Sequence, residues 1–311
     1  MKDNTPIFIL ILLFIFVGFS YGPFKNAKLN NSNGVGGASS SFGKTNENLG
    51  PISNKETAEE IKNAEANIKK LEENLAKQIE EKKRSPFYGK VQMSHISGLG
   101  NQDPNKEYVS LSTNLDKKET VNITGWYLKS EVTGYYTTIG KATLLPFPFT
   151  KADSSVMLQQ RDRVIVTKGF SPIGISFRTN KCTGYFEENR TFYPGLSKKC
   201  PQLIDEKLPQ FSSVYDRNDE CLEIIENIPR CTTKGSSFIR DLSDTVPESC
   251  KTYITTRINY NSCVALHFGD TDFPGNEYRL FLNKFGPLWR ERSDKIILHD
   301  QNGLIVDSIS Y

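Results

Sequence analysis

The sequence predicts a mainly β protein, built as an antiparallel β-sandwich that follows a helix and is interrupted by a cysteine-containing insert. Three observations support this prediction. Apolar and polar residues alternate in short runs from Tyr88 onward, turn-forming residues separate those runs at regular intervals, and all six cysteines fall between Cys182 and Cys263. Short strands at regular spacing are typical of a sandwich rather than of a βαβ fold.

The N-terminal residues predict export. Ile7 to Phe19 are almost all apolar and are followed by the small residues Ser20 and Gly22. A run this short fits the hydrophobic region of a signal peptide better than a full membrane span of ~20 residues. An uncleaved anchor is the alternative, because no clean Ala-x-Ala site follows. We expect residues 1–22 to be a signal peptide or signal anchor, which makes the protein secreted, or membrane-anchored and facing outside the cytoplasm.

Two segments of different composition come next. Residues 23–54 are rich in Asn, Gly and Ser, which predicts a flexible low-complexity linker. Residues 55–85 are rich in Glu, Lys, Ala and Leu and predict a helix that ends at Ser85-Pro86. Gln78 and Lys82 occupy its last two heptad core positions, so a coiled coil forming a homo-oligomer and a solvated single helix acting as a stalk both stay open. The apolar heptad positions are Ile61, Ala64, Ile68, Leu71 and Leu75.

Residues 86–311 carry the strand pattern. Val109 and Leu111 alternate with polar neighbours, and Trp126 and Leu128 repeat the alternation. Turn residues separate the runs, for example at Asp103-Pro104-Asn105 and at Pro146-Phe147-Pro148. Further strands are predicted at Val121 to Ile123, Arg163 to Thr167, Asp294 to Leu298 and Leu304 to Tyr311.

Three of these stretches resemble the lamin-tail domain. Asp103 to Leu111 resembles the family segment in which Asn-Pro or Asp-Pro leads into Glu-Tyr/Trp-Val-x-Leu, and Val121 to Leu128 resembles its Leu/Ile-x-Gly-Trp-x-Leu strand. Trp289 to Tyr311, with the turn Asp300-Gln-Asn-Gly303, resembles its closing hairpin. The resemblance implies an immunoglobulin-like β-sandwich of the exported or membrane-anchored bacterial type.

The same resemblance implies structural roles for six residues. Glu107 and Asp300 are expected to hold turns and strand ends by hydrogen bonding, and Asn302-Gly303 to provide the positive φ angles of a tight hairpin turn. The six positions are Glu107, Gly125, Trp126, Asp300, Gly303 and Asp307.

Where the family has a short connection, this chain has an insert of about residues 178–285. An even number of cysteines in one region of an exported chain predicts disulfides, and six cysteines allow 15 pairings that sequence does not distinguish. We expect a disulfide-braced, partly helical insert, with helices near Glu220 to Ile228 and Phe273 to Leu282. The disulfide candidates are Cys182, Cys200, Cys221, Cys231, Cys250 and Cys263.

Candidate chemistry in the insert is sparse. Cys263 lies four residues before His267, the one spacing that suggests a thiol nucleophile with a base, but a disulfide is the stronger interpretation of Cys263. The cysteine and histidine spacings do not fit a zinc site, and Asp270 and Asp272 lack the pattern of a calcium loop, so we expect no metal and no cofactor.

An aromatic group in the insert is a candidate binding surface for a protein or a glycan. The alternative is that these side chains pack the insert onto the sandwich. The group consists of Tyr185, Phe186, Phe192 and Tyr193.

Charge and composition narrow the expected function. The formal net charge is only +3, without the concentrated basic patch of a nucleic-acid binder, so nucleic acid is not an expected partner. We expect a non-enzymatic, secreted or cell-envelope-associated interaction or structural protein, held at the membrane by its N-terminal segment if that is uncleaved, with an unknown protein or glycan partner. The alternatives are an exported hydrolase using Cys263 and His267, and a DNA-holding accessory module.

Overall fold

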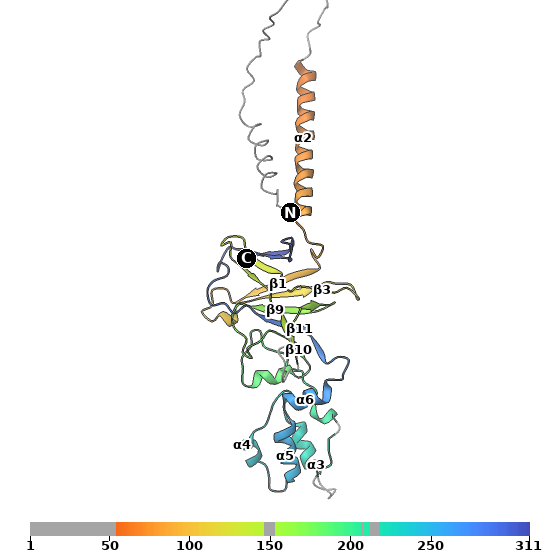
Figure 1. Ribbon diagram of the computed structural model, residues 1–311, viewed down its shortest axis with the longest axis vertical. Helices are drawn as coiled ribbons and strands as arrows, with labels where there is room; N and C mark the ends of the chain where they lie inside the picture. Colours follow the sequence, from red (N-terminus) through yellow and green to blue (C-terminus); the bar gives the residue numbers. More distant parts are fainter. Residues whose placement is uncertain (1–53, 146–152, 207, 212–217) are drawn as a thin grey trace, which may run out of the picture. The chain divides into compact units, whose positions relative to one another are not determined.

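The computed structural model describes residues 54–145, 153–206, 208–211 and 218–311 (Figure 1). The expected export segment, the linker before residue 54 and the Pro146-Phe147-Pro148 turn lie outside the described residues. None of the described helices has both the length and the apolar character needed to span a membrane. The chain divides into two units between Ala64 and Glu65, within the first described helix.

That helix confirms the helical part of the prediction for residues 55–85. Helix α2 spans Asn54–Lys82, and its side chains from residue 59 onward are exposed. Beyond the helix, Ser85 donates its backbone N–H to the carbonyl of Ile305 at 2.8 Å, and its hydroxyl accepts the N–H of Phe87 at 3.2 Å. Pro86 cannot donate a backbone hydrogen bond, so the chain leaves the helix and joins the sheets at this point.

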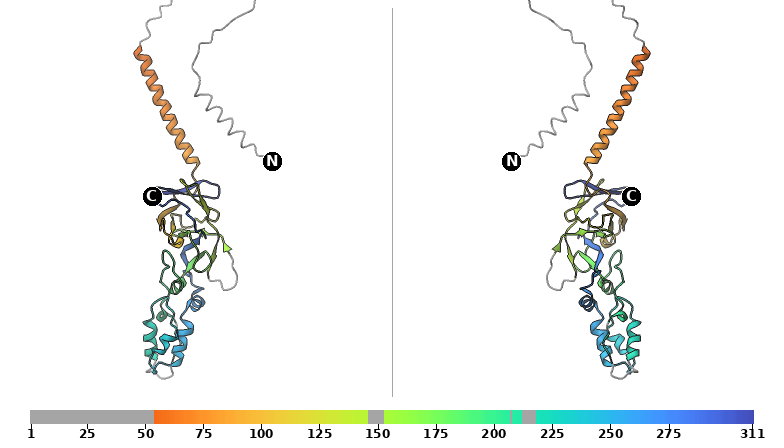
Figure 2. Two further views of the ribbon diagram at one scale, coloured as in Figure 1. Left: turned by 90° about the vertical axis from the view of Figure 1, so that its left-hand side faces the viewer. Right: turned by 90° about the vertical axis from the view of Figure 1, so that its right-hand side faces the viewer.

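The described residues form three sheets (Figures 1 and 2). The largest has the strand order β1-β2-β9-β11-β10-β6-β7, the second has the order β13-β12-β4-β5, and β3 pairs with β8. The first sheet contains β1 (Val91–Ser97), β2 (Tyr108–Thr113), β6 (Ala142–Leu144), β7 (Asp153–Ser154), β9 (Arg163–Thr167), β10 (Phe177–Asn180) and β11 (Pro274–Phe281). The others contain β3 (Val121–Asn122), β4 (Tyr127–Ser130), β5 (Tyr136–Thr138), β8 (Met157–Leu158), β12 (Lys295–His299) and β13 (Ile305–Ser310).

The two larger sheets share one hydrophobic core. The register places Leu111, Val164 and Tyr278 in one cross-strand row of the larger sheet. Leu128 and Leu298 pair on the smaller sheet and belong to the same core. Each fully buried side chain of this size contributes about 1.5–3 kcal/mol relative to exposure, so the shared core stabilises the β-rich fold that the sequence predicted. Its other large members include Val109, Ile123, Trp126, Ile139, Val166, Leu280 and Trp289.

Two strand pairs differ from the expected all-antiparallel arrangement. Strand β9 pairs in parallel with β11, and β6 pairs in parallel with β10. The reason lies in the order of the chain: β11 returns from the insert and enters the sheet between β9 and β10, antiparallel to β10 alone. The larger sheet is therefore mixed.

The helix expected at Phe273 to Leu282 is wrong, because these residues contain strand β11. Tyr278 belongs to the core, while its neighbours Glu277 and Arg279 point to the opposite face of the sheet. Hydrogen bonding to β9 on one side and β10 on the other outweighs the local helical preference after Pro274.

The helical part of the insert is confirmed. Helix α3 covers most of the stretch predicted from Glu220 to Ile228, and it lies beside α5 (Figure 1). The two helices pack through Ile225 and Ile254, which are both buried. The elements are the short helices η2 (Thr183–Glu188) and η3 (Leu203–Asp205), and the helices α3 (Asn218–Glu226), α4 (Ser236–Arg240), α5 (Glu248–Arg257) and α6 (Tyr260–His267).

A buried ion pair joins the start of β2 to the end of β9. The carboxylate of Glu107 lies 2.6 Å from the ammonium of Lys168, and the two side chains are only 3% and 7% exposed. The backbone N–H of Lys168 also donates to the carbonyl of Glu107 at 2.9 Å. Burial raises the pKa of Glu107, and the hydrogen bond and charge of Lys168 oppose that shift. Each buried charge of the pair is therefore stabilised by the other.

Replacing Lys168 by Met should lower the free energy of unfolding by about 3–5 kcal/mol, because a buried carboxylate loses its partner. Urea denaturation followed by the fluorescence of the core residues Trp126 and Trp289 measures this change. Adding Glu107→Gln to Lys168→Met should restore part of the loss. Equal stability of Lys168→Met and the natural protein would show that the pair does not stabilise this junction.

The Lys168→Met variant should also show a stronger dependence of stability on pH than the natural protein. Burial already raises the pKa of Glu107 above the unfolded value of about 4.3, and without the hydrogen bond and charge of Lys168 that oppose it the pKa rises further. A group with a raised carboxyl pKa favours the folded state at low pH, and this advantage is lost as the pH rises through the unfolded value. The stability gap between variant and natural protein should therefore widen from pH 4 to pH 7.

Candidate functional site

The insert leaves the sheet through a β-hairpin. Strands β10 and β11 pair antiparallel, and residues 181–273 lie between them. Directly beyond the strands, Cys182 is bonded to Cys263, and Lys181 donates its backbone N–H to the carbonyl of Phe273 at 3.1 Å. These contacts close the insert at its base. We call this closure the neck, and it comprises residues 180–183 and 270–275 together with Cys263.

Charged side chains reinforce the neck. The ammonium of Lys181 lies 2.8 Å from Asp270 and 2.5 Å from Asp272, and these carboxylates raise the pKa of Lys181. His267 lies between two carboxylates, with Nδ1 2.9 Å from Asp270 and Nε2 3.2 Å from Glu206. Lys181 and, to a smaller extent, His267 lower the pKa of Asp270. Segments far apart in the sequence therefore meet in one ionic network.

All six predicted disulfide cysteines are paired. The bonds join Cys182 to Cys263, Cys200 to Cys231, and Cys221 to Cys250. Three disulfides indicate an oxidising, extracellular environment. They also bear on the hydrolase alternative, because a sulfur bonded to Cys182 is not the free thiolate that a Cys263 nucleophile requires.

The aromatic group proposed as a binding surface contributes to packing. Tyr185 and Phe192 are buried, and Phe186 and Tyr193 are half-buried. Phe186 and Phe192 both make edge-on contacts with Phe177 of β10, with ring centroids 6.2 and 6.0 Å away. Burial raises the pKa of Tyr185 to about 12. The packing alternative therefore accounts better for these residues.

The six residues of the lamin-tail-like motifs have structural contacts. Asp300 Oδ1 accepts the N–H groups of Asn302 at 2.8 Å and Leu304 at 3.0 Å, as expected for a residue that holds the turn. Gly303 has a φ of +81°, but Asn302 is not among the residues with positive φ, so the turn uses one such position there rather than two. The other motif residues also have structural roles. Glu107 pairs with Lys168, and Asp307 accepts the N–H of Met93 at 2.6 Å. Gly125 has a φ of +88°, and Trp126 lies in the shared core.

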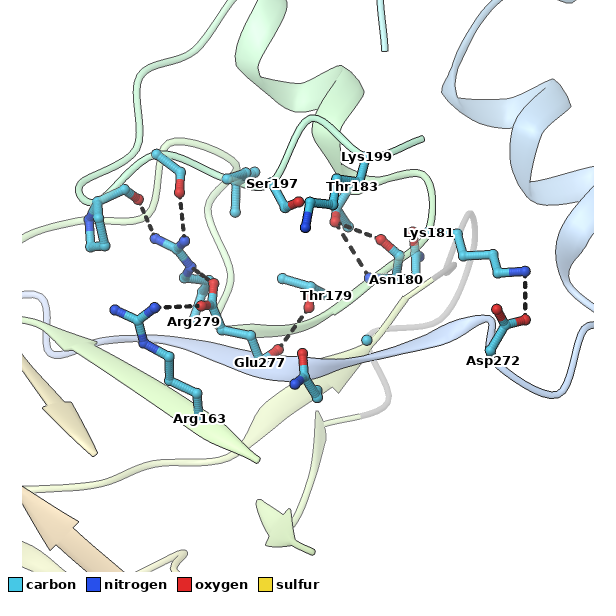
Figure 3. Close-up of a pocket in the computed structure, with 15 residues that line it drawn as sticks. Arg163, Thr179, Asn180, Lys181, Thr183, Ser197, Lys199, Asp272, Glu277 and Arg279 are labelled. Atoms are coloured by element: carbon cyan, nitrogen blue, oxygen red, sulfur yellow. Dashed lines mark hydrogen bonds and ion pairs between the residues drawn. The ribbon is translucent and has the colours of Figure 1, made fainter. Parts of the chain in front are cut away.

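A cavity of about 380 Å³, lined mainly by polar and charged residues, lies beside the neck (Figure 3). Its floor is the face of the sheet that points away from the shared core, where Arg163 of β9 stands opposite Glu277 of β11. One wall is the segment from residue 194 to residue 199, and the neck supplies the rest. The labelled side chains in Figure 3 are Arg163, Thr179, Asn180, Lys181, Thr183, Ser197, Lys199, Asp272, Glu277 and Arg279.

Arg279 holds the wall of this cavity against the sheet. Its side chain is 2% exposed, and its Nε donates to Glu277 at 2.5 Å. Its two terminal nitrogens donate to the backbone carbonyls of Pro194 and, at 2.9 Å, Gly195. Burial lowers the pKa of Arg279, and the charge and hydrogen bond of Glu277 oppose that shift. Arg279 is therefore occupied by internal contacts, and its role is to position the wall.

Two other cations are less engaged. The exposed Arg163 approaches Glu277 only to 3.8 Å, and the exposed Lys199 has no ion pair with any described residue. The hydroxyls of Thr179 and Thr183 donate to backbone carbonyls, so neither is activated by a basic side chain. This arrangement suits the binding of a polar group with negative charge and hydrogen-bond acceptors.

Sequence reasoning missed this cavity. The one local signal was the charged pair Glu277 and Arg279, which alternates with the core residue Tyr278 in a segment assigned to a helix. In the part of the chain that the structure describes, no three His, Cys, Asp or Glu side chains are grouped to hold a metal ion.

Comparisons with protein-family models, with curated proteins and with solved structures found no match to this chain. The lamin-tail resemblance therefore stays a prediction.

Removing the neck disulfide with Cys182→Ala and Cys263→Ala should destabilise the insert by about 2–4 kcal/mol, because its two ends are no longer joined. Hydrogen exchange resolved by mass spectrometry should show faster exchange in η2 and α6, while the core strands stay protected.

The matched control is Cys221→Ala with Cys250→Ala, which removes the bond between α3 and α5 and should speed exchange in those helices instead. The same exchange pattern in both variants would contradict a separate role for the neck.

Proposed function

We propose that this chain is a non-enzymatic, secreted or cell-envelope-associated interaction or structural protein that displays its disulfide-braced insert from a β-rich domain. The observation that carries the proposal is the set of three disulfides, all within the insert. Disulfides persist in oxidising compartments outside the cytoplasm, and there they stabilise small segments that lack a large core. The buried residues of the insert form small separate clusters, one around Ile225 and Ile254 and one around the neck disulfide.

We further propose that the β-rich domain is an immunoglobulin-like, lamin-tail-like β-sandwich. Support comes from the motif segments, which supply strands of both larger sheets: Glu107 precedes β2, Trp126 precedes β4, and Asp300 holds the turn between β12 and β13. The proposal treats the insert as an elaboration of this domain, entering between β10 and β11.

The proposed partner is a protein or an anionic glycan of the cell envelope, contacted beside the neck. The polar lining and the weakly engaged cations Arg163 and Lys199 support this choice. These are two positive charges at one cavity, which is too few to contact the many phosphates along a DNA duplex that a DNA-holding module would bind. Attachment to the membrane would come from residues 1–22 if they are uncleaved.

Mass mapping without reduction, on chain exported into an oxidising compartment and alkylated, should find three disulfides with the pairing seen here and no alkylated cysteine. The same chain made in a reducing cytoplasm is the control and should contain fewer bonds. A free Cys263 in the exported protein would contradict the proposal and restore the Cys263 and His267 alternative.

Replacing both Arg163 and Lys199 by Ser should weaken binding of the purified chain to isolated envelope material at least about tenfold, because each charged contact is worth about 1.5–3 kcal/mol. A pull-down titration measures the change. Lys117→Ser with Lys118→Ser removes two exposed charges outside the cavity and should leave binding unchanged. Equal loss in both variants would show that net charge, and not the cavity, governs binding.

A further inference from the structure

Helix α2 carries an apolar face that no described residue covers. Its large apolar side chains are all about half exposed or more, in contrast with the fully buried side chains of the shared core. A face of this kind on a long helix usually packs against another helix, because a solvated helix gains little from its apolar residues. The residues and their exposed fractions are Ile61 60%, Ile68 55%, Leu71 67%, Leu75 57% and Ile79 46%.

The heptad positions of α2 fix which residues flank that face. Ile61, Ile68 and Leu75 occupy position a, and Leu71 occupies position d. The flanking positions e and g contain glutamate, asparagine and one isoleucine, and no lysine or arginine. At e they are Glu65, Glu72 and Ile79, and at g they are Glu60, Asn67, Asn74 and Glu81.

Pairing with a second copy brings like charges together in either orientation. In a parallel pair, position g faces position e of the next heptad in the partner, which sets Glu60 against Glu65 of the second copy. The antiparallel alignment that packs Ile68 against Leu71 of the second copy also brings glutamates together. At position e Glu65 faces Glu72, and at position g Glu60 faces Glu81. Like charges at these positions disfavour the pairing of α2 with α2 of a second copy.

The lysines of α2 do not relieve this repulsion. Lys62 and Lys69 lie at position b, and Lys70 and Lys77 lie at position c, away from the contact with a partner helix. Lys82 lies at the last a position, where a charged residue specifies which partner and which register fit. The positions that flank the apolar face therefore contain no lysine, although glutamates and lysines occur together on the opposite side of the helix.

We propose that α2 binds an amphipathic helix of another protein that carries lysine or arginine at its own e and g positions. The apolar face supplies the contact area, and the flanking glutamates of α2 select a basic partner over an acidic partner and over a second copy. This interaction surface goes beyond the function proposed for the neck and does not depend on it.

Two synthetic helical peptides test the proposal. Both have isoleucine at a and leucine at d over four heptads, and they differ only in having lysine or glutamate at e and g. Fluorescence anisotropy of each labelled peptide, titrated with the full chain, should show at least about tenfold tighter binding of the lysine peptide, because each pair with one of the flanking glutamates changes from repulsion to attraction. Raising the salt concentration should narrow the difference.

Variants of the chain identify the surface. Leu71→Lys should abolish binding of the lysine peptide, because it places a charge in the apolar face. Glu65→Lys with Glu72→Lys should remove the preference, because the two new lysines offset Glu60 and Glu81 at position g. The matched control, Glu73→Lys with Glu80→Lys, makes the same change of charge at position f and should leave the preference unchanged, and circular dichroism checks that each variant keeps its helix.

Three outcomes would overturn the proposal. They are equal binding of the two peptides, binding of neither peptide, and self-association of the full chain that Leu71→Lys abolishes. The last outcome would assign the face to a second copy and favour the coiled-coil homo-oligomer that the sequence analysis left open.

Discussion

The pairing of β10 with β11 is the constraint on which the insert and the cavity depend. Both strands lie within the larger sheet, and β11 also pairs with β9 and contributes Tyr278 to the shared core. The core thus fixes β11, β11 fixes Arg279, and Arg279 fixes the wall at Pro194 and Gly195. The neck disulfide closes the same hairpin covalently. A long insert can therefore hold a defined cavity at its base, because the base belongs to the sheet.

Buried charge is a consequence of that architecture. Strand β9 is covered on both faces, with Val164 in the shared core and Ile165 fully buried on the other side. Polar groups that lie near such a strand must find partners, and both Lys168 and Arg279 do so. A buried ion pair often adds little net stability compared with an apolar pair, whereas loss of one partner is costly. We infer that these charges mainly fix position, and that the apolar core supplies most of the stability.

Local signals explain which parts of the fold were predictable. The strand that follows Trp126 and the turn at Gly303 have local preferences that a short stretch of sequence reveals, and helix α2 has a clear heptad pattern. Strand β11 escaped because its position depends on β9, far earlier in the chain, and on its return from the insert. The pairing of the cysteines escaped because spacing does not distinguish among connectivities. The cavity escaped because its wall reaches the floor only through Arg279, a contact between residues far apart in sequence.

The chain stabilises its two helical regions by different means. The insert helices are short, and even α5 has only 10 residues, which is below the ~12–15 residues at which isolated helices become marginal in water. Disulfides and the small core around Ile254 supply what their length does not. Helix α2 has 29 residues and no covalent constraint or covering side chain in the described part of the chain. The disulfides therefore stabilise the insert helices without a partner helix. In α2 the exposed apolar face has no such internal support, which is consistent with the partner helix proposed for it.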